Sequence, residues 1–165
     1  MAAMTDFNTR AGTVAAIESE CIRQGLTLPA QIAYVLATVE HETNSTFKPV
    51  REAYWMPEWY RKRFRYYPYY GRGYVQLTWD YNYRRYADLL GIDLVGNPDL
   101  AMQPEIACYI LVHGFRTGLF TGKKITDYIN ATKVDMVGAR RCINGKDRAQ
   151  KIAGVGMRRL RTMTA

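Results

Sequence analysis

Cysteine and histidine are scarce in this chain of 165 residues, which has three cysteines and two histidines. Cys21, Cys108 and Cys142 are widely spaced, and each has apolar neighbours. They form neither a disulfide framework nor a zinc-ligand spacing. We therefore expect buried free thiols in a protein made in a reducing compartment.

Residues for metal or nucleophile chemistry are also few. His41-Glu42 begins like the zinc motif HExxH, but Ser45 stands where the second histidine would be, and His113 lies in an apolar helical segment. Neither Ser19 nor Ser45 lies in a nucleophile elbow, and Gly71-Arg72-Gly73 lacks the lysine and the spacing of a phosphate loop. We expect no metal, no cofactor and no phosphate loop.

A leader segment and long apolar runs are missing as well. Met1–Thr13 is polar in part and lacks the roughly 7–15-residue apolar core of a signal peptide. The longest apolar runs fall short of the ~20 residues that a membrane span needs. We expect synthesis in the cytoplasm, with any export by another route.

Acidic residues are nearly absent between residues 140 and 161. The net charge is +8, and this stretch has eight basic residues against one acid, Asp147. The eight are Arg140, Arg141, Lys146, Arg148, Lys151, Arg158, Arg159 and Arg161. Such a field indicates a polyanionic partner, whether nucleic acid, anionic lipid or a cell-wall polymer. A solvated helix face kept soluble by its charge explains it equally well.

Helical periodicity dominates the chain outside residues 44–78. A length of 165 residues fits one domain, so we expect a single catalytic domain over residues 1–165. The expected helices are Thr9–Arg23, a second that opens at Pro29 and runs through Val39, Trp79–Leu90, Gln103–Phe115, Ile125–Asn130, Val134–Cys142 and Arg148–Met163. The pattern predicts an all-α fold with a loop-rich insert around residues 44–78, which has a short helical turn near Met56–Arg63 and room for a small β-hairpin.

A carboxylate lies on the apolar stripe of the second helix. Glu42 follows Val39 by three residues and Val35 by seven, so it shares their face. A lone buried charge is costly, so such a residue is neutralised, paired or functional. The alternative is a glutamate that turns out to solvent at a frayed helix end.

Aromatic residues are concentrated between residues 44 and 83, which hold all three Trp and nine of the thirteen Tyr. Such rings stack on sugars or bases, or they form a second core beneath a loop. Cutting a glycosidic bond needs a proton donor and, in the inverting form, a base that activates water. Glu42, backed by an apolar helix, suits the protonated acid, and Glu52 in a polar loop suits the base, with Glu58 as a competitor.

Three motifs in this order resemble the family 19 glycoside hydrolases, which include chitinases and the peptidoglycan-cleaving endolysins of bacteriophages. They are His41-Glu42-Thr43, the stretch YGRGYVQLTWDYNY from Tyr70 to Tyr83, and Cys142-Ile143-Asn144-Gly145. The resemblance covers about residues 30 to 160 and implies a lysozyme-like helical fold with an inverting mechanism.

The resemblance also implies roles for single residues. Glu42 matches the general acid, Glu52 the base at the endolysin spacing, and Thr78 the hydroxyl that holds the attacking water. The implied substrate-binding residues are Gln76, Asn82, Tyr70, Arg72 and Asn144. The chain departs from the family at Asn44-Ser45 and again at Lys146, which stands where the family has a second glycine.

A small basic chain without a leader resembles the endolysin branch most. We expect a monomer that is stored in the host bacterial cytoplasm and reaches the cell wall after the membrane is permeabilised. Its expected substrate is peptidoglycan, cut at the β-1,4 bonds between N-acetylmuramic acid and N-acetylglucosamine, with contact to anionic lipopolysaccharide through the basic C-terminal helix. Muramidase, glucosaminidase and transglycosylase products remain open, as do a chitinase and a non-catalytic wall-binding protein. A nucleic-acid partner is not expected, because no groove-reading or single-strand motif accompanies the charge.

Overall fold

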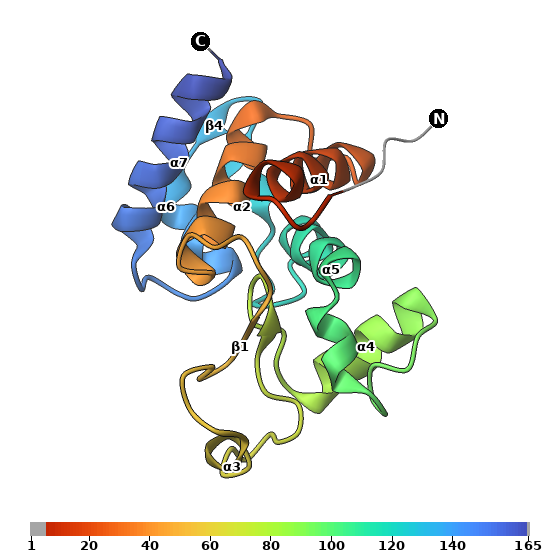
Figure 1. Cartoon of the computed structure of the whole chain (residues 1–165). Coiled ribbons are helices and arrows are strands. Elements are labelled where there is room, and N and C mark those ends of the chain that lie inside the picture. Colours follow the sequence, from red (N-terminus) through yellow and green to blue (C-terminus); the bar gives the residue numbers. More distant parts are fainter. Residues whose placement is uncertain (1–5, 165) are drawn as a thin grey trace. The chain divides into compact units, whose positions relative to one another are not determined.

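The computed structural model describes residues 6–164, and these residues are mainly helical (Figure 1). The longer helices are α1 (Arg10–Arg23), α2 (Pro29–Glu42), α4 (Asp80–Leu90), α5 (Pro104–Thr117) and α7 (Ala149–Met163). Short helical segments are α3 (Glu58–Arg61), η1 (Pro98–Met102), η2 (Ile125–Asp127), α6 (Met136–Ala139) and η3 (Arg140–Cys142). The expected helical class is confirmed. No helix among residues 6–164 is both long and apolar enough to cross a bilayer.

The chain divides into two compact units. Unit 1 consists of the residues up to Phe47 together with those from Leu111 onward, and unit 2 is Lys48–Ile110. The division falls within α5, whose first half belongs to unit 2. The expectation of one catalytic domain over residues 1–165 stays a prediction.

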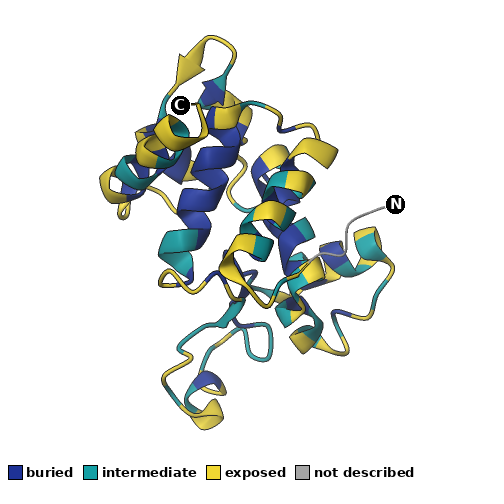
Figure 2. Ribbon diagram, turned by 45° about the horizontal axis from the view of Figure 1, so that its top comes forward, coloured by how far each residue is buried: buried dark blue, intermediate teal, exposed yellow. Residues whose placement is uncertain are grey.

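Helix α2 is the centre of unit 1. It begins with Pro29 at its first position, where a missing N–H leaves no bond unmade, and the N–H of Leu28 donates to the side chain of Gln31. Every residue from Ala30 to Val39 is buried, and Figure 2 shows this buried stretch along the helix. Full burial of an aliphatic side chain contributes about 1.5–3 kcal/mol, so this helix is a large part of the core.

Helix α7 packs antiparallel against α2, so its N-terminal end lies beside the C-terminal end of α2 (Figure 1). Helix α6 packs closely on α7 at Gly156, where an added Cβ would lie 2.6 Å from the sulfur of Met136. The end of α2 that carries Glu42 is therefore held beside the start of α7.

A hairpin replaces part of the expected helices in unit 1. Strand β3 (Ile129–Asn130) pairs antiparallel with β4 (Lys133–Val134). The helix predicted over Ile125–Asn130 is therefore present only as η2, and the helix predicted over Val134–Cys142 begins at Met136 and is formed by α6 and η3. The Asn130 side chain accepts hydrogen bonds from both the N–H and the hydroxyl of Thr132, each at 3.0 Å. These local bonds give the backbone an alternative to the helix.

Unit 2 is built largely from loops around a second small hairpin. Strand β1 (Val50–Arg51) pairs antiparallel with β2 (Arg72–Gly73), which confirms the small hairpin within the loop-rich insert. Helix α4 ends where it was expected, at Gly91, whose φ of +65° is a left-handed conformation that glycine adopts without a steric penalty.

Candidate active site

Glu42 is the last residue of α2, and its carboxylate pairs with a buried cation. Its Oε1 accepts a hydrogen bond from Nη1 of Arg140 at 2.9 Å, and the two side chains are 19% and 2% exposed. Nε of Arg140 donates to the backbone carbonyl of Asp147 at 2.8 Å, which fixes the guanidinium. Of the alternatives that the sequence left open for Glu42, the structure shows a paired carboxylate, and the apolar helix behind it is joined by a guanidinium. Oε2 forms no hydrogen bond within residues 6–164, so it is the oxygen left for a ligand.

The turn after Glu42 is strained and tightly bonded. Asn44, Ser45 and Phe47 have φ values of 52°, 67° and 56°, in the left-handed region that costs a non-glycine residue about 1–2 kcal/mol. The hydroxyl of Thr43 donates to the carbonyl of Val39 at 2.7 Å and accepts from the N–H of Phe47 at 3.0 Å. Strain of this kind clusters at functional sites, so it supports a role for the end of α2.

Glu40 anchors the same helix turn from another side. Its Oε1 pairs with Arg10 at 2.8 Å and with Arg159 at 3.2 Å. The two guanidinium groups also lie over the ring of Phe47, at 4.6 and 5.3 Å from its centre. Glu40 therefore ties α1 and α7 to the end of α2, whereas one oxygen of Glu42 remains available.

Glu52 follows β1 in unit 2, and both of its carboxylate oxygens accept hydrogen bonds. Oε2 accepts from the hydroxyl of Tyr66 at 2.5 Å, and Oε1 accepts from the N–H of Gly71 at 2.9 Å. Burial raises the pKa of Tyr66, and the bond to Glu52 raises it further, so this phenol remains a donor at neutral pH. Two neutral donors thus orient the Glu52 carboxylate.

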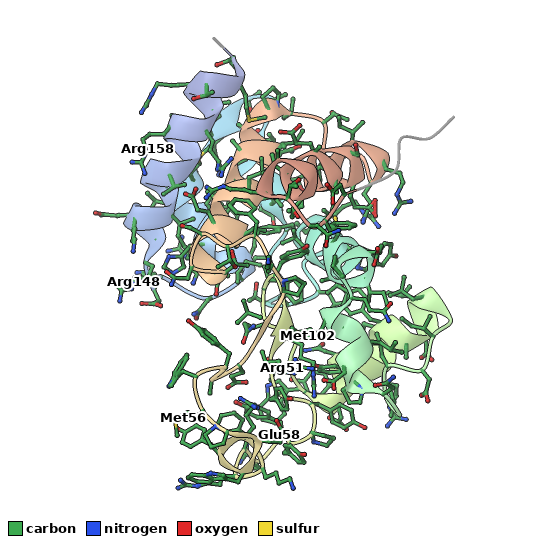
Figure 3. The ribbon with its side chains drawn as sticks, in the orientation of Figure 1. Arg51, Met56, Glu58, Met102, Arg148 and Arg158 are labelled. Carbon is green, nitrogen blue, oxygen red and sulfur yellow. The ribbon has the colours of Figure 1, made fainter. Side chains whose placement is uncertain are left out.

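Glu58, the competing base, is held in an ion pair. Glu58 is the first residue of α3. Figure 3 labels it together with Arg51, the last residue of β1. Oε2 of Glu58 accepts from Nε of Arg61 at 2.9 Å. Arg61 is buried and also donates to the backbone carbonyls of Ala53 and Met56. The Glu58 side chain is therefore part of the bonding that shapes this loop, and Glu52 is the carboxylate of this loop that contacts only neutral donors.

Three further candidates form one hydrogen-bonded chain in unit 2. The hydroxyl of Thr78 donates to the carbonyl of Gln76 at 2.8 Å, and Nδ2 of Asn82 donates to the carbonyl of Thr78 at 2.9 Å. Gln76 has a φ of 61°, and its Nε2 donates to the carbonyl of Val50 at 2.8 Å. The hydroxyl proton of Thr78 is thus engaged, which leaves its oxygen to accept a hydrogen bond from water.

Tyr70 and Arg72 lie in the interior of unit 2, which does not suit the expected contact of their side chains with substrate. They are 2% and 4% exposed, and the guanidinium lies over the Tyr70 ring at 3.8 Å. Arg72 donates to Asp99 at 3.0 Å, to the carbonyl of Pro68 at 2.9 Å and to the hydroxyl of Tyr83 at 3.0 Å. These bonds connect distant loop segments, so we assign the pair to the framework of the site.

Asn144 belongs to unit 1 and lies in the exposed loop before α7. Its N–H donates to the carbonyl of Arg140 at 2.8 Å, so it is connected to the residue that pairs with Glu42. Sequence reasoning counted Arg140 as one of eight basic residues and missed this role. The signal was weak, because the partners are 98 positions apart.

Exposed aromatic rings are a second feature of unit 2. Trp55 and Trp59 are 73% and 59% exposed, and Tyr54 and Tyr81 are exposed as well. Rings of this kind are suited to stacking on sugar faces. Within residues 6–164, no group of three or more His, Cys, Asp or Glu side chains is arranged to hold a metal ion.

Known proteins resemble the chain in both sequence and fold. Residues 54–120 match the family described as chitinase class I. Endochitinase At2g43610 of Arabidopsis thaliana is 36% identical over 111 residues, which are 61% of this chain and 37% of that protein. Chitinase 11 of Oryza sativa subsp. japonica is 52% identical over 42 residues, or 26% of this chain and 16% of that protein. The chain thus spans little more than a third of the first of these relatives and less of the second.

Solved structures extend the likeness to nearly the whole chain. A bacterial family 19 chitinase superposes with a TM-score of 0.59 at 25% identity, covering 93% of this chain and 85% of that one. Chitinase C from Streptomyces griseus superposes with a TM-score of 0.57 at 22% identity, covering 96% of this chain and 69% of that one. The fold is that of the family 19 chitinases, and the sequence match to chitinase class I covers residues 54–120. The endolysin branch stays a prediction.

Proposed function

We propose that this protein is a family 19 glycosidase that hydrolyses β-1,4-linked polymers of N-acetylated amino sugars. The observation that carries the proposal is Glu42, which ends a buried helix, is held through Oε1 by Arg140 and has Oε2 free. The match of residues 54–120 to chitinase class I supports the same reaction type.

Each candidate residue has a definite task in the proposed inverting reaction. Oε2 of Glu42 donates a proton to the glycosidic oxygen as the bond from that oxygen to the anomeric carbon breaks. Glu52 takes a proton from water as the water oxygen bonds to the anomeric carbon. The oxygen of Thr78 accepts a hydrogen bond from that water, because its own proton is engaged by Gln76. The side-chain amides of Gln76 and Asn82, whose nitrogens donate to the carbonyls of Val50 and Thr78, bind sugar groups through their oxygens.

Within this activity we propose peptidoglycan as the substrate, cut between N-acetylmuramic acid and N-acetylglucosamine, and host lysis at the end of a phage infection as the role. The support is electrostatic: a net charge of +8 suits an anionic wall polymer, whereas chitin is neutral. Storage in the host cytoplasm belongs to the same proposal. The second candidate is a chitinase, which the names of the relatives favour.

The test is digestion of bacterial sacculi and of N-acetylglucosamine oligomers, with products identified by mass spectrometry. New reducing ends on peptidoglycan are expected, and their sugar separates a muramidase from a glucosaminidase. Cleavage of the oligomers alone would establish the chitinase instead. Anhydro ends would indicate a transglycosylase, and binding without any product a wall-binding protein.

Two pairs of variants test the carboxylates. Glu42→Gln is expected to lower kcat by at least about 100-fold, because it removes the proton donor. Glu40→Gln, two residues earlier in the same helix, is the matched control and should keep near-native kcat. Glu52→Gln should likewise lose turnover while Glu58→Gln retains it. Glu42→Gln with more than about a tenth of native kcat would be incompatible with general acid catalysis by this residue.

A further inference from the structure

An open cavity of about 540 Å³ lies at the start of α7 in unit 1. Its lining contains four cationic side chains, Arg141, Lys146, Arg148 and Lys151, and we call it the basic pocket. All four side chains are exposed, and no carboxylate lines the cavity. The pocket is therefore a concave site with charge of one sign.

These four cations differ from others in the same basic stretch. Arg140 and Arg159 are used inside the unit, where they pair with Glu42 and Glu40. None of the cations in the basic pocket forms an ion pair within residues 6–164. Mutual repulsion without compensation disfavours such a cluster, so its charge is available to an anionic ligand.

The first turn of α7 adds to this positive potential. Its N-cap residue, Arg148, has a φ of 59° and provides no side-chain hydrogen bond to the helix. Uncapped backbone N–H groups at a helix start attract anions, and this helix is 15 residues long. The helix start alone would not define a site, but here it opens beside four cations.

The basic pocket lies at the end of the unit where α2 presents Glu42. Burial lowers the pKa of His41, and the charges of Arg140, Lys151 and Arg148 lower it further, against the opposing effect of Glu42. Two cations of the pocket are thus within electrostatic range of the residue preceding Glu42. A ligand held in the pocket would lie beside the candidate acid.

We propose that the basic pocket binds the carboxylate groups that an anionic glycan carries beside the bond cut at Glu42. This inference rests on the proposed glycosidase function and specifies its substrate class. Peptide-bearing wall glycan has such carboxylates, and a polymer of N-acetylglucosamine has none. The pocket therefore selects a charged strand over a neutral one.

A flat anionic membrane surface fits this arrangement less well. The other exposed cations of α7 are Arg158 and Arg161, in the second half of the helix, and Figure 3 shows Arg148 at the start of α7 and Arg158 farther along it. A membrane would engage cations along the whole helix. The pocket instead concentrates four in one cavity beside the end of α2.

The experiment compares two forms of one soluble peptidoglycan fragment, native and with its carboxylates converted to carboxamides. Wild-type KM is expected to be about tenfold lower for the native form in low salt, because several exposed ion pairs contribute. In the double variant Lys146→Gln/Lys151→Gln, the ratio of the KM for the carboxamide form to the KM for the native form should fall to about twofold. Arg158→Gln/Arg161→Gln removes the same charge elsewhere on α7 and should keep the wild-type ratio.

Other outcomes would overturn the proposal. An unchanged ratio in Lys146→Gln/Lys151→Gln would show that the pocket takes no part, and an equal fall in both double variants would show a general charge effect. If Lys146→Gln/Lys151→Gln no longer bound phosphatidylglycerol vesicles but kept the wild-type ratio of KM values, the pocket would be assigned to membrane binding. If the wild-type protein cleaves neither fragment, the glycosidase proposal fails. Binding of the two fragments, measured by fluorescence anisotropy, then tests the pocket alone by the same ratio.

Discussion

Removal of Arg140 is expected to change both the stability of unit 1 and the turnover of the enzyme. Its side chain is 2% exposed and that of Glu42 is 19% exposed, so the pair is largely shielded from water. Removing one partner of a buried ion pair costs about 3–5 kcal/mol. Glu42 keeps some contact with water, which places the cost of Arg140→Met at the lower end, about 3 kcal/mol, including the lost bond to the Asp147 carbonyl.

A double-mutant cycle isolates the pairwise part of this energy. Glu42→Gln keeps an acceptor for Arg140 and should cost only about 1–2 kcal/mol. If the two groups interact as the 2.9 Å contact indicates, the double variant should be less destabilised than the sum of the single variants by about 1.5–2.5 kcal/mol. The assay is urea unfolding followed by circular dichroism, with the free energy obtained by linear extrapolation.

Turnover provides a second, independent reading of the same pair. Arg140→Met should lower kcat about 10–100-fold with little change in KM, because Oε1 of Glu42 is no longer held in one orientation. Arg140→Lys restores the charge without the planar fork and should recover part of the loss. Arg141→Met, at the exposed neighbour, is the stability control and should stay within about 0.5 kcal/mol of wild type. A coupling energy below about 0.5 kcal/mol would refute the reasoning.

Two further predictions concern the interior of the units. Arg72→Met should lower the free energy of unfolding in urea by about 3 kcal/mol, because it leaves buried hydrogen-bond acceptors unpaired. Arg51→Gln removes a half-exposed ion pair and should cost less than about 0.5 kcal/mol. Similar losses in the two variants would contradict the assignment of Arg72 to the framework. Burial raises the pKa of Cys21 and Cys142 from 9.0 to about 12. Unfolded thiols ionise first, so stability should be complete below pH 9 and decline as the pH rises from 9 toward 12. Native-state alkylation by iodoacetamide at the rate of a free thiol, read by mass spectrometry, would contradict this burial.

Local signals in the sequence predicted much of the helical framework. Proline at the first position of α2 and glycine at the end of α4 act on bonds within one helical turn, so both ends could be read from neighbouring residues. The hairpin of β3 and β4 was missed, because a short apolar run suits a strand as well as a helix and the Asn130 turn decided between them.

The sequence predicted which kinds of residue form the candidate site but did not predict which of them contact one another. By itself, the sequence determined that a carboxylate ends the buried face of α2, that aromatic loops follow it, and that positive charge gathers after residue 140. Only the tertiary structure decided which cation enters the core beside Glu42, which four surround a cavity, and that Tyr70 and Arg72 are interior. The physical reason is range: periodicity and capping act over a few residues, whereas a partner 98 positions away is chosen by packing.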